Sequence, residues 1–370
     1  MSLQRHRLAA RLFDVAVGLS NALAGLPGKL LPPPVRLVQI GASFWQSRAL
    51  YVATRLDLAT ALGGGSLGVA QLADKVGADA DALRRLLRML AALGVFEEAK
   101  PGIYRNNRLS SGLRTDRRDN VRAMILMHNS PEMSRPWFET LEQGIRTGEM
   151  PFRLTHGGDL FARMDADPDF ERLFAQAMDQ VEALAGDSFA TSFDWSAFER
   201  IIDVGGSKGA KSMAILKRHA HLRAVVVDRP MVIEGAKAHW AECKEASCLD
   251  RMRFEAGDVF TSVPSPESNR DLYLLSAVLH CFDDNLCAKA LGNVAAAAAT
   301  TGSRIVVLET VVRDFRADLA SAAMDMQMFM GTSGRERTRA EWEDVFKRGG
   351  VSLEEIVHLP SFGKMLVLRP

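Results

Sequence analysis

The residues best suited to chemistry in this chain stand at the ends of strand-like runs. Asp228, Asp258, His280 and Glu309 follow four such runs in order along the second half of the sequence. The carboxyl ends of parallel strands meet at one edge of an open α/β sheet, where such sheets bind ligands. A carboxylate at that edge can accept hydrogen bonds from ribose hydroxyls, and a histidine titrates near neutral pH. The four side chains are therefore expected to form one constellation.

A glycine-rich turn within residues 199–209 precedes these groups and is the element around which they are arranged. The run ERIIDV meets GGSKG, and a helix-like stretch over residues 210–219 follows. This order is typical of the first strand, turn and helix of an open α/β sheet, where glycine lets the backbone approach a ligand. A dinucleotide fingerprint is absent because Ser207 replaces its second glycine. A phosphate-binding loop is absent because Lys211 and Ser212 do not directly follow a glycine.

The apolar runs predict the strands that position the site. They are expected near residues 200–204, 223–228, 252–256, 271–278, 303–309, 352–358 and 364–368. The last two are expected to pair as a hairpin around residues 360–363.

The ordered motifs DVGGSKG, VVVDRP, AGDVF, LLSAVLHCFDD, IVVLET and GRERT resemble one family. They are similar to the S-adenosylmethionine-dependent O-methyltransferases of the plant caffeate/hydroxyindole type, which include many bacterial natural-product enzymes. The likeness covers roughly residues 35–370. It implies a Rossmann-like α/β domain, the class I methyltransferase domain, with seven strands of which the last is antiparallel. A mostly α winged-helix dimerisation domain would precede it.

The resemblance also implies roles for individual residues. S-Adenosylmethionine would be the cofactor and S-adenosylhomocysteine its product, with Asp228 on the ribose hydroxyls and Asp258 and Val259 beside the adenine. His280 would be the general base, oriented by Glu309 and Glu336. The full set of expected cofactor-binding residues is Asp203, Gly205, Gly206, Gly209, Asp228, Arg229, Asp258, Val259 and Ser276.

Four positions depart from the family pattern. Ser207 stands where the turn usually has a glycine, Ser276 where a lysine is common, and Cys281 where an aspartate usually follows the histidine. Phe282 replaces a tryptophan. The two serines could change how the cofactor is posed, and Cys281 could change how the base is held. Carbon or nitrogen methylation, or decarboxylation or hydroxylation with the cofactor still bound, therefore remain alternatives to O-methylation.

The front of the chain predicts a second fold. Helices expected over residues 69–76 and 82–93, capped by Ser66 and Asp79, precede a small hairpin in a winged-helix pattern. Exposed arginines at positions 84, 85 and 88 would suit a DNA-binding regulator, but the resemblance favours a homodimer that binds no nucleic acid. The apolar run over residues 35–62 is expected to pack on the partner, and 31–34 to form a linker or turn. Three domains are expected. Residues 1–118 would form the dimerisation domain, 119–192 a helical linker that covers the substrate pocket, and 193–370 the domain that binds S-adenosylmethionine.

Methionine and aromatic side chains mark the expected pocket for a small aromatic acceptor. Residues 120–187 are expected to be helical, and such side chains adapt well to an apolar ligand, although core packing is the alternative for each. His128 and His156 could contact polar groups of a substrate. The predicted substrate-binding residues are Met124, Met127, His128, Trp137, Phe161, Phe174, Met178, Met324 and Met328.

Composition is that of a globular protein, and no stretch approaches a transmembrane span. The chain has 370 residues, 25% charged and 47% hydrophobic, which is ordinary globular composition and long enough for two domains. An apolar N-terminal stretch behind three arginines could be a signal peptide, but an amphipathic arm is favoured. Four cysteines without zinc spacing predict free thiols, a cytoplasmic enzyme and no metal. Asp283 and Asp284 are expected to cap the helix that follows them.

Overall fold

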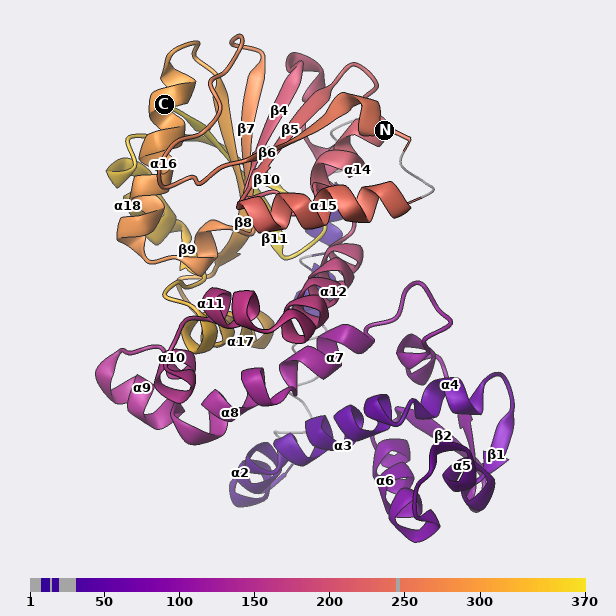
Figure 1. The fold of residues 1–370 in the computed structure, drawn as a ribbon. Coiled ribbons are helices and arrows are strands. Elements are labelled where there is room, and N and C mark those ends of the chain that lie inside the picture. The colour runs from indigo at the N-terminus through magenta and orange to yellow at the C-terminus, as the bar shows by residue number, and fades with distance from the viewer. Residues whose placement is uncertain (1–7, 14, 20–30, 244–246) are drawn as a thin grey trace. The chain divides into compact units, whose positions relative to one another are not determined.

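The structure, a computed structural model, describes residues 8–13, 15–19, 31–243 and 247–370 and contains two compact units. One unit comprises residues 24–185, and the other comprises residues 1–23 with 186–370. The elements are labelled in Figure 1. Most of the arm expected over residues 1–34 lies outside the described residues. The described parts of it include two helical segments, 8–13 and 15–19. The domain boundaries expected from the sequence stay a prediction.

The second unit is built on a twisted sheet in which all seven expected strands are confirmed. The strand order is β10-β11-β8-β7-β4-β5-β6, and the two-residue β9 (Arg337–Thr338) pairs with the end of β8. Strand β11 runs antiparallel to β8 and to β10, as expected, and the remaining pairs are parallel. The strands are β4 (Arg200–Val204), β5 (Arg223–Asp228), β6 (Met252–Ala256), β7 (Asp271–Ser276), β8 (Arg304–Val312), β10 (Ser352–His358) and β11 (Gly363–Arg369).

Alternating side chains along the strands bury both faces of this sheet. On one face Ile202 and Tyr273 pack with helices α16 (Asp284–Ala299) and α18 (Arg339–Arg348). On the other face Ile201 packs with α13 (Phe189–Ser192) and α14 (Ala210–Arg218). Helix α15 (Pro230–Glu242) follows β5, and α17 (Leu319–Gly331) follows β8. A side-chain period of two explains why neighbouring residues of one strand belong to different cores.

The order of the strands defines where a ligand would bind. Strand β4 lies between β5 and β7, so the chain moves outward in opposite directions on its two sides. The helix after β4 covers one face and the helix after β7 covers the other (Figure 1). The carboxyl ends of these two strands therefore flank a topological switch point, where open α/β sheets bind ligands. Strand β7 stops at Ser276, two residues earlier than expected, because Ala277 takes a left-handed conformation with φ 54°.

The unit of residues 24–185 is helical apart from one small sheet. Its winged-helix part contains α5 (Val69–Val76), α6 (Ala80–Ala92), β2 (Phe96–Lys100) and β3 (Ile103–Asn106), in agreement with the sequence pattern. Strand β1 (Ser66–Gly68) pairs with β3. The other elements are α2 (Pro33–Gly41), α3 (Ser43–Arg55), α4 (Leu58–Leu62), α7 (Arg122–His128), α8 (Pro131–Glu139), α9 (Leu141–Thr147), α10 (Pro151–His156), α11 (Leu160–Ala166) and α12 (Pro168–Ala185).

Two local predictions for this unit were wrong, and two predicted helix caps, one in each unit, were right. Ser66 does not cap α5, because it belongs to β1; the backbone amide of Gly68 instead bonds the Gln71 side chain at that helix start. The expected linker at residues 31–34 already contains the start of α2, since proline is tolerated in the first turn of a helix. Asp79 caps α6 and Asp283 caps α16, each accepting hydrogen bonds from backbone amides.

The four cysteines are free, as expected. Among the described residues no helix is both long and apolar enough to span a bilayer.

A buried ion pair fastens the amino ends of β4 and β7. The guanidinium of Arg200 donates from Nε to Asp271 Oδ2 at 3.0 Å, and the side chains are 8% and 1% exposed. Replacing one member of a buried pair leaves the other charge poorly compensated. Without Asp271, the buried guanidinium of Arg200 would keep only its ion pair with the half-exposed Glu267.

We expect Asp271→Ala to lower the free energy of unfolding by about 3–5 kcal/mol, measured by urea denaturation. The matched control is Arg223→Ala, which breaks the half-exposed pair with Glu267. Exposed pairs contribute about 0–1 kcal/mol, so this variant should be close to wild type. Equal losses in the two variants would contradict the assigned role of burial.

Candidate active site

His280 lies in a short 3-10 helix (Leu279–Cys281) directly after β7. The buried carboxylate of Glu309 holds this turn in place. Its Oε1 accepts hydrogen bonds from the backbone amides of Val278 and Leu279, both at 2.9 Å. The histidine's own backbone amide lies 3.4 Å from the same oxygen. Glu309 comes from the adjacent strand β8, so two neighbouring strand ends position the histidine.

A second glutamate holds the imidazole ring. Nδ1 of His280 lies 2.9 Å from Glu336 Oε1 and 3.7 Å from Glu309 Oε2. The histidine side chain is 17% exposed and both glutamate side chains are 1% exposed. A carboxylate at this distance accepts a hydrogen bond, so Nδ1 is the donor and the lone pair of the neutral ring lies on Nε2. The structure therefore brings together the three residues that the resemblance placed in one catalytic group.

Opposing effects set the ionisation of this group. Burial alone would lower the pKa of His280, but the charge of Glu309, Cys281 and the hydrogen bond to Glu336 raise that pKa well above its ordinary value. Burial raises the pKa of Glu309, and Glu336 adds to this, whereas the charge of His280 and the amides of Val278 and Leu279 act to lower it. The arrangement favours a cationic imidazole and stabilises the imidazolium that proton uptake would produce.

The loop that carries Glu336 is pressed against the histidine turn. Arg337 is fully buried and donates to Leu279 O and Phe282 O, and its guanidinium also pairs with Asp284. A Cβ at Gly334 would lie 1.9 Å from His280 O, so the two backbones pack in direct contact. Asp284 thus pairs with arginine and leaves the capping of α16 to Asp283. Sequence reasoning missed this clamp, although Arg337 belongs to the GRERT motif.

The side chains of Val278 and Asp203 pack closely against the turn after β4. Gly205 has φ 73°, and a Cβ there would lie 2.6 Å from a methyl group of Val278. A Cβ at Gly206 would lie 2.6 Å from the carboxyl carbon of Asp203. Asp203 is 1% exposed and accepts a hydrogen bond from Ser212 Oγ at 2.7 Å. The buried Asp203 therefore restricts the conformation of the turn.

Asp228 accepts hydrogen bonds from two backbone amides, one of which belongs to the turn after β4. Ser207 N donates to Oδ2 at 2.9 Å, and Arg229 N donates to Oδ1 at 2.7 Å. Each carboxylate oxygen keeps a further lone pair for a ligand. Ser207 has φ 52°, a left-handed conformation in which glycine would be relaxed. Because its backbone amide makes the contact, the serine departs from the family pattern without loss of this hydrogen bond.

The remaining cofactor candidates line the neighbouring strand ends. Asp258 Oδ1 accepts from Phe260 N at 2.9 Å, which fixes the turn after β6, and Val259 O accepts from Asn293 Nδ2 at 2.7 Å. Ser276, at the end of β7, has a buried hydroxyl without a hydrogen-bond partner among the described residues. An unpartnered hydroxyl beside an oriented carboxylate and a glycine turn fits a polar nucleoside ligand such as S-adenosylmethionine. No cluster of metal-ligating side chains is found in the described parts of the chain, and metal independence stays a prediction.

The predicted substrate-binding residues fall into both compact units. Met324 and Met328 lie on α17, and the others lie on helices of the unit 24–185. Met127 is 2% exposed and belongs to the core of its unit, in agreement with the alternative for that residue. Their contact with a substrate stays a prediction. The partly exposed or exposed members are Met124, His128, Trp137, Phe161, Phe174, Met178, Met324 and Met328.

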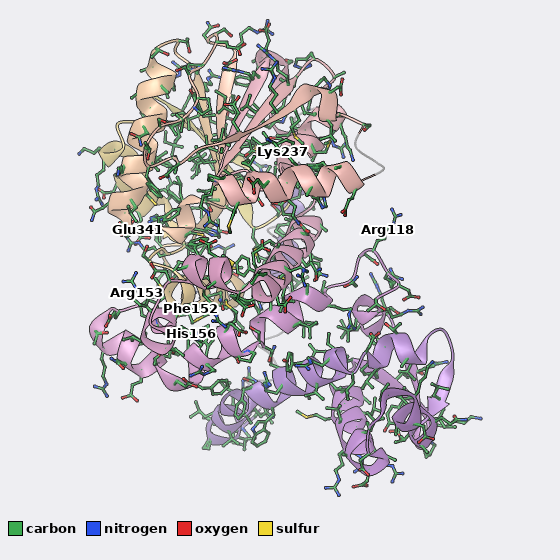
Figure 2. The ribbon with its side chains drawn as sticks, in the orientation of Figure 1. Arg118, Phe152, Arg153, His156, Lys237 and Glu341 are labelled. Atoms are coloured by element: carbon green, nitrogen blue, oxygen red, sulfur yellow. The ribbon has the colours of Figure 1, made fainter. Side chains whose placement is uncertain are left out.

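His156 has a structural environment. It lies on α10 next to Phe152, with ring centroids 4.5 Å apart, and its Nε2 lies 2.9 Å from Glu132 O (Figure 2). One ring nitrogen is therefore satisfied by backbone, which agrees with the structural alternative weighed for this residue.

The switch-point site and the seven-stranded sheet with one antiparallel strand define a class I methyltransferase fold. Residues 138–352 match the O-methyltransferase domain family, and residues 38–116 match the O-methyltransferase dimerisation domain. The chain therefore belongs to this O-methyltransferase family and is an S-adenosylmethionine-dependent O-methyltransferase.

Relatives and solved structures agree with membership of this family, and one of the relatives is named as an N-methyltransferase. The 3-amino-4-hydroxybenzoate 4-O-methyltransferase of Streptomyces cremeus is 33% identical over 88% of this chain and 87% of its own length. The phenazine-1-carboxylate N-methyltransferase of Pseudomonas aeruginosa is also 33% identical, over 90% and 96%. Human N-acetylserotonin methyltransferase in complex with S-adenosylmethionine superposes with a TM-score of 0.80 at 27% identity, covering 92% of this chain and 98% of that one.

The geometry of Asp228 leads to a binding prediction. Replacing Asp228 by alanine should weaken the binding of S-adenosylhomocysteine by about 1.5–3 kcal/mol, because charge-assisted hydrogen bonds are lost. Isothermal titration calorimetry measures the change. Glu255→Ala removes an exposed carboxylate from the paired strand β6 and is the matched control, expected to bind as wild type. Tight binding of NAD by the wild type would contradict the assignment of the site.

Proposed function

We propose that the enzyme transfers a methyl group to a hydroxyl of a small, mainly apolar aromatic molecule, with His280 as general base. The observation that carries this proposal is the contact of 2.9 Å between His280 Nδ1 and Glu336 Oε1, at the carboxyl edge of the sheet beside Gly205. S-Adenosylmethionine, when bound, supplies an electrophilic methyl group on its sulfonium. Support for an aromatic hydroxyl acceptor comes from the hydroxybenzoate O-methyltransferase to which the chain is similar.

The chain's own residues would orient the reaction and take the proton. Glu336 holds Nδ1 as the donor, which leaves Nε2 free to accept the proton of the hydroxyl. Glu309 and Glu336 stabilise the imidazolium that results, while Glu309 also fixes the backbone of the turn. Asp228, the turn after β4 and Ser276 would hold the cofactor, so that its methyl group and the acceptor oxygen align for in-line attack.

Removing the imidazole tests the role of His280. We expect His280→Ala to bind S-adenosylhomocysteine as wild type does and to lower turnover by ~10²–10⁴-fold, the usual effect of losing a general base. The measurement compares the variants at equal cofactor occupancy, with transfer of an isotopically labelled methyl group as the readout. His239→Ala, which removes an exposed histidine on α15, is the control. Equal turnover would make His280 structural.

The position of the label on the product separates the alternatives. A methyl group on nitrogen would favour the chemistry named for the phenazine-1-carboxylate relative. A product that lacks the labelled methyl group would favour decarboxylation or hydroxylation, and Cys281 would then be the first residue to replace by aspartate.

The raised pKa of His280 gives the enzyme a defined pH dependence. A raised pKa keeps the imidazole protonated to higher pH than an ordinary histidine, and the neutral base forms as pH rises through that pKa. We expect kcat/KM to rise with pH through the same range. Glu309→Gln keeps an oxygen that can accept from the turn but removes a charge that raises the pKa, so the rise should move to lower pH.

The comparison uses one acceptor for every variant, so that the acidity of the acceptor cancels. Asp283→Asn, at the cap of α16, should keep the wild-type profile because asparagine caps helices as well as aspartate does. A profile that does not move in Glu309→Gln would contradict the electrostatic role given to Glu309.

We further propose that the enzyme is a homodimer assembled through the unit that contains residues 38–116, which match the dimerisation domain. Helices α2 and α3 expose a run of large apolar side chains, a feature that usually marks an interface. These side chains include Val35, Leu37, Val38, Ile40, Phe44 and Trp45, exposed by 44–70%.

Charge placed in this run should prevent assembly. We expect the wild type to have the mass of a dimer by light scattering and Phe44→Glu/Trp45→Glu to have the mass of a monomer. Ile145→Glu, at an exposed apolar position on α9, should remain dimeric. A monomeric wild type would contradict the proposal, and salt-sensitive binding to duplex DNA would favour the regulator alternative.

A further inference from the structure

Asp325 lies next to the candidate base without contacting it. It stands on α17, and its Oδ1 accepts a hydrogen bond from the backbone amide of Glu336 at 2.9 Å. In the sequence it is the one acidic residue of the methionine-rich stretch MDMQMFM. The side chain is half-buried.

Within the described parts of the chain, the carboxylate of Glu336 accepts one hydrogen bond, from His280. Its Oε1 is engaged by His280, and its Oε2 is buried without a hydrogen-bond partner among the described residues. The position of Oε1 therefore depends on the backbone of residues 334–338. Arg337 fastens that backbone on one side through Asp284 and two carbonyl groups, and Asp325 fastens it at Glu336 itself.

We propose that Asp325 is a positioning residue that, by accepting the Glu336 amide, keeps Glu336 Oε1 in hydrogen-bond contact with Nδ1 of His280. The proposal rests on the proposed function, because it concerns the same base. The effect reaches His280 through backbone placement, and an uncharged acceptor at position 325 should therefore suffice.

The charges around both groups are consistent with this role. Burial raises the pKa of Asp325, the bond from Glu336 N lowers it, the carboxylates of Glu336 and Glu341 raise it, and Arg335 lowers it. His280 is faced by Glu309, Cys281 and Glu336. An uncharged acceptor at position 325, such as asparagine, would not repel the carboxylates of Glu336 and Glu341.

The test follows the imidazole itself in the full-length enzyme saturated with S-adenosylhomocysteine. The titration of His280 is recorded by NMR and assigned among the eight histidines by comparison with His280→Ala. Asp325→Ala should lower the pKa of His280, because the hydrogen bond from Nδ1 to Glu336 is loosened. Asp325→Asn should restore the wild-type titration. If the alanine variant does not fold, Asp325→Leu removes the acceptor while keeping the branching of the asparagine side chain.

Kinetics supply the second readout. Asp325→Ala should lower kcat by about 10–100-fold, the scale of a small misplacement in an active site, while KM for S-adenosylmethionine stays near wild type. Asp325→Asn should recover most of the activity. Asp318→Ala is the matched control, because Asp318 caps the same helix through Ser321 without touching Glu336.

The outcomes separate this proposal from the proposed function. An unchanged His280 titration in Asp325→Ala, or the same change in Asp318→Ala, overturns the positioning role. Equal changes in the alanine and asparagine variants also overturn it, since charge and not placement would then act. A lowered pKa with full turnover supports the coupling and shows that His280 is not the base.

Discussion

The arrangement of this site depends on one buried carboxylate. Glu309 lies within strand β8 and is almost wholly excluded from solvent, and it accepts hydrogen bonds from the backbone amides of Val278 and Leu279. Leaving such a charge buried without hydrogen bonds would be very unfavourable, so the turn after β7 must keep its amides directed at it. This constraint fixes where His280 leaves the sheet and how close Val278 comes to the turn after β4.

Much of the fold could be predicted from the sequence, because hydrophobic periodicity marks buried strands strongly. The seven strands lie where their apolar runs predict, and the aspartates at positions 79 and 283 cap helices as their types suggest. The failures were local. Ser66 belongs to a strand that pairs with β3, and that pairing depends on residues about forty positions away. Strand β7 ends early because Ala277 adopts a conformation that alanine rarely takes.

The site could be predicted only as far as its motifs extend. His280, Glu309 and Glu336 were each placed at the correct element, and the structure brings them into contact. The sequence could not show that Glu309 holds the backbone while Glu336 holds the ring. It also gave no account of the clamp formed by Arg337 and Asp284, because these contacts join segments that are more than fifty residues apart. Long-range polar pairing has no periodic signature.

The division of labour between the two glutamates affects how such an enzyme can evolve. Since Glu309 supports the turn through backbone atoms, its bonds do not depend on which side chain stands at position 280. The ring and its partner Glu336 can therefore change while the turn keeps its shape, and the cofactor turn beside it loses no support. Loss of the imidazole alone would leave the buried carboxylate of Glu336 without a hydrogen-bond partner among the described residues, so the ring and Glu336 would have to change together. Cys281, which stands where the family usually has an aspartate, directly follows this histidine.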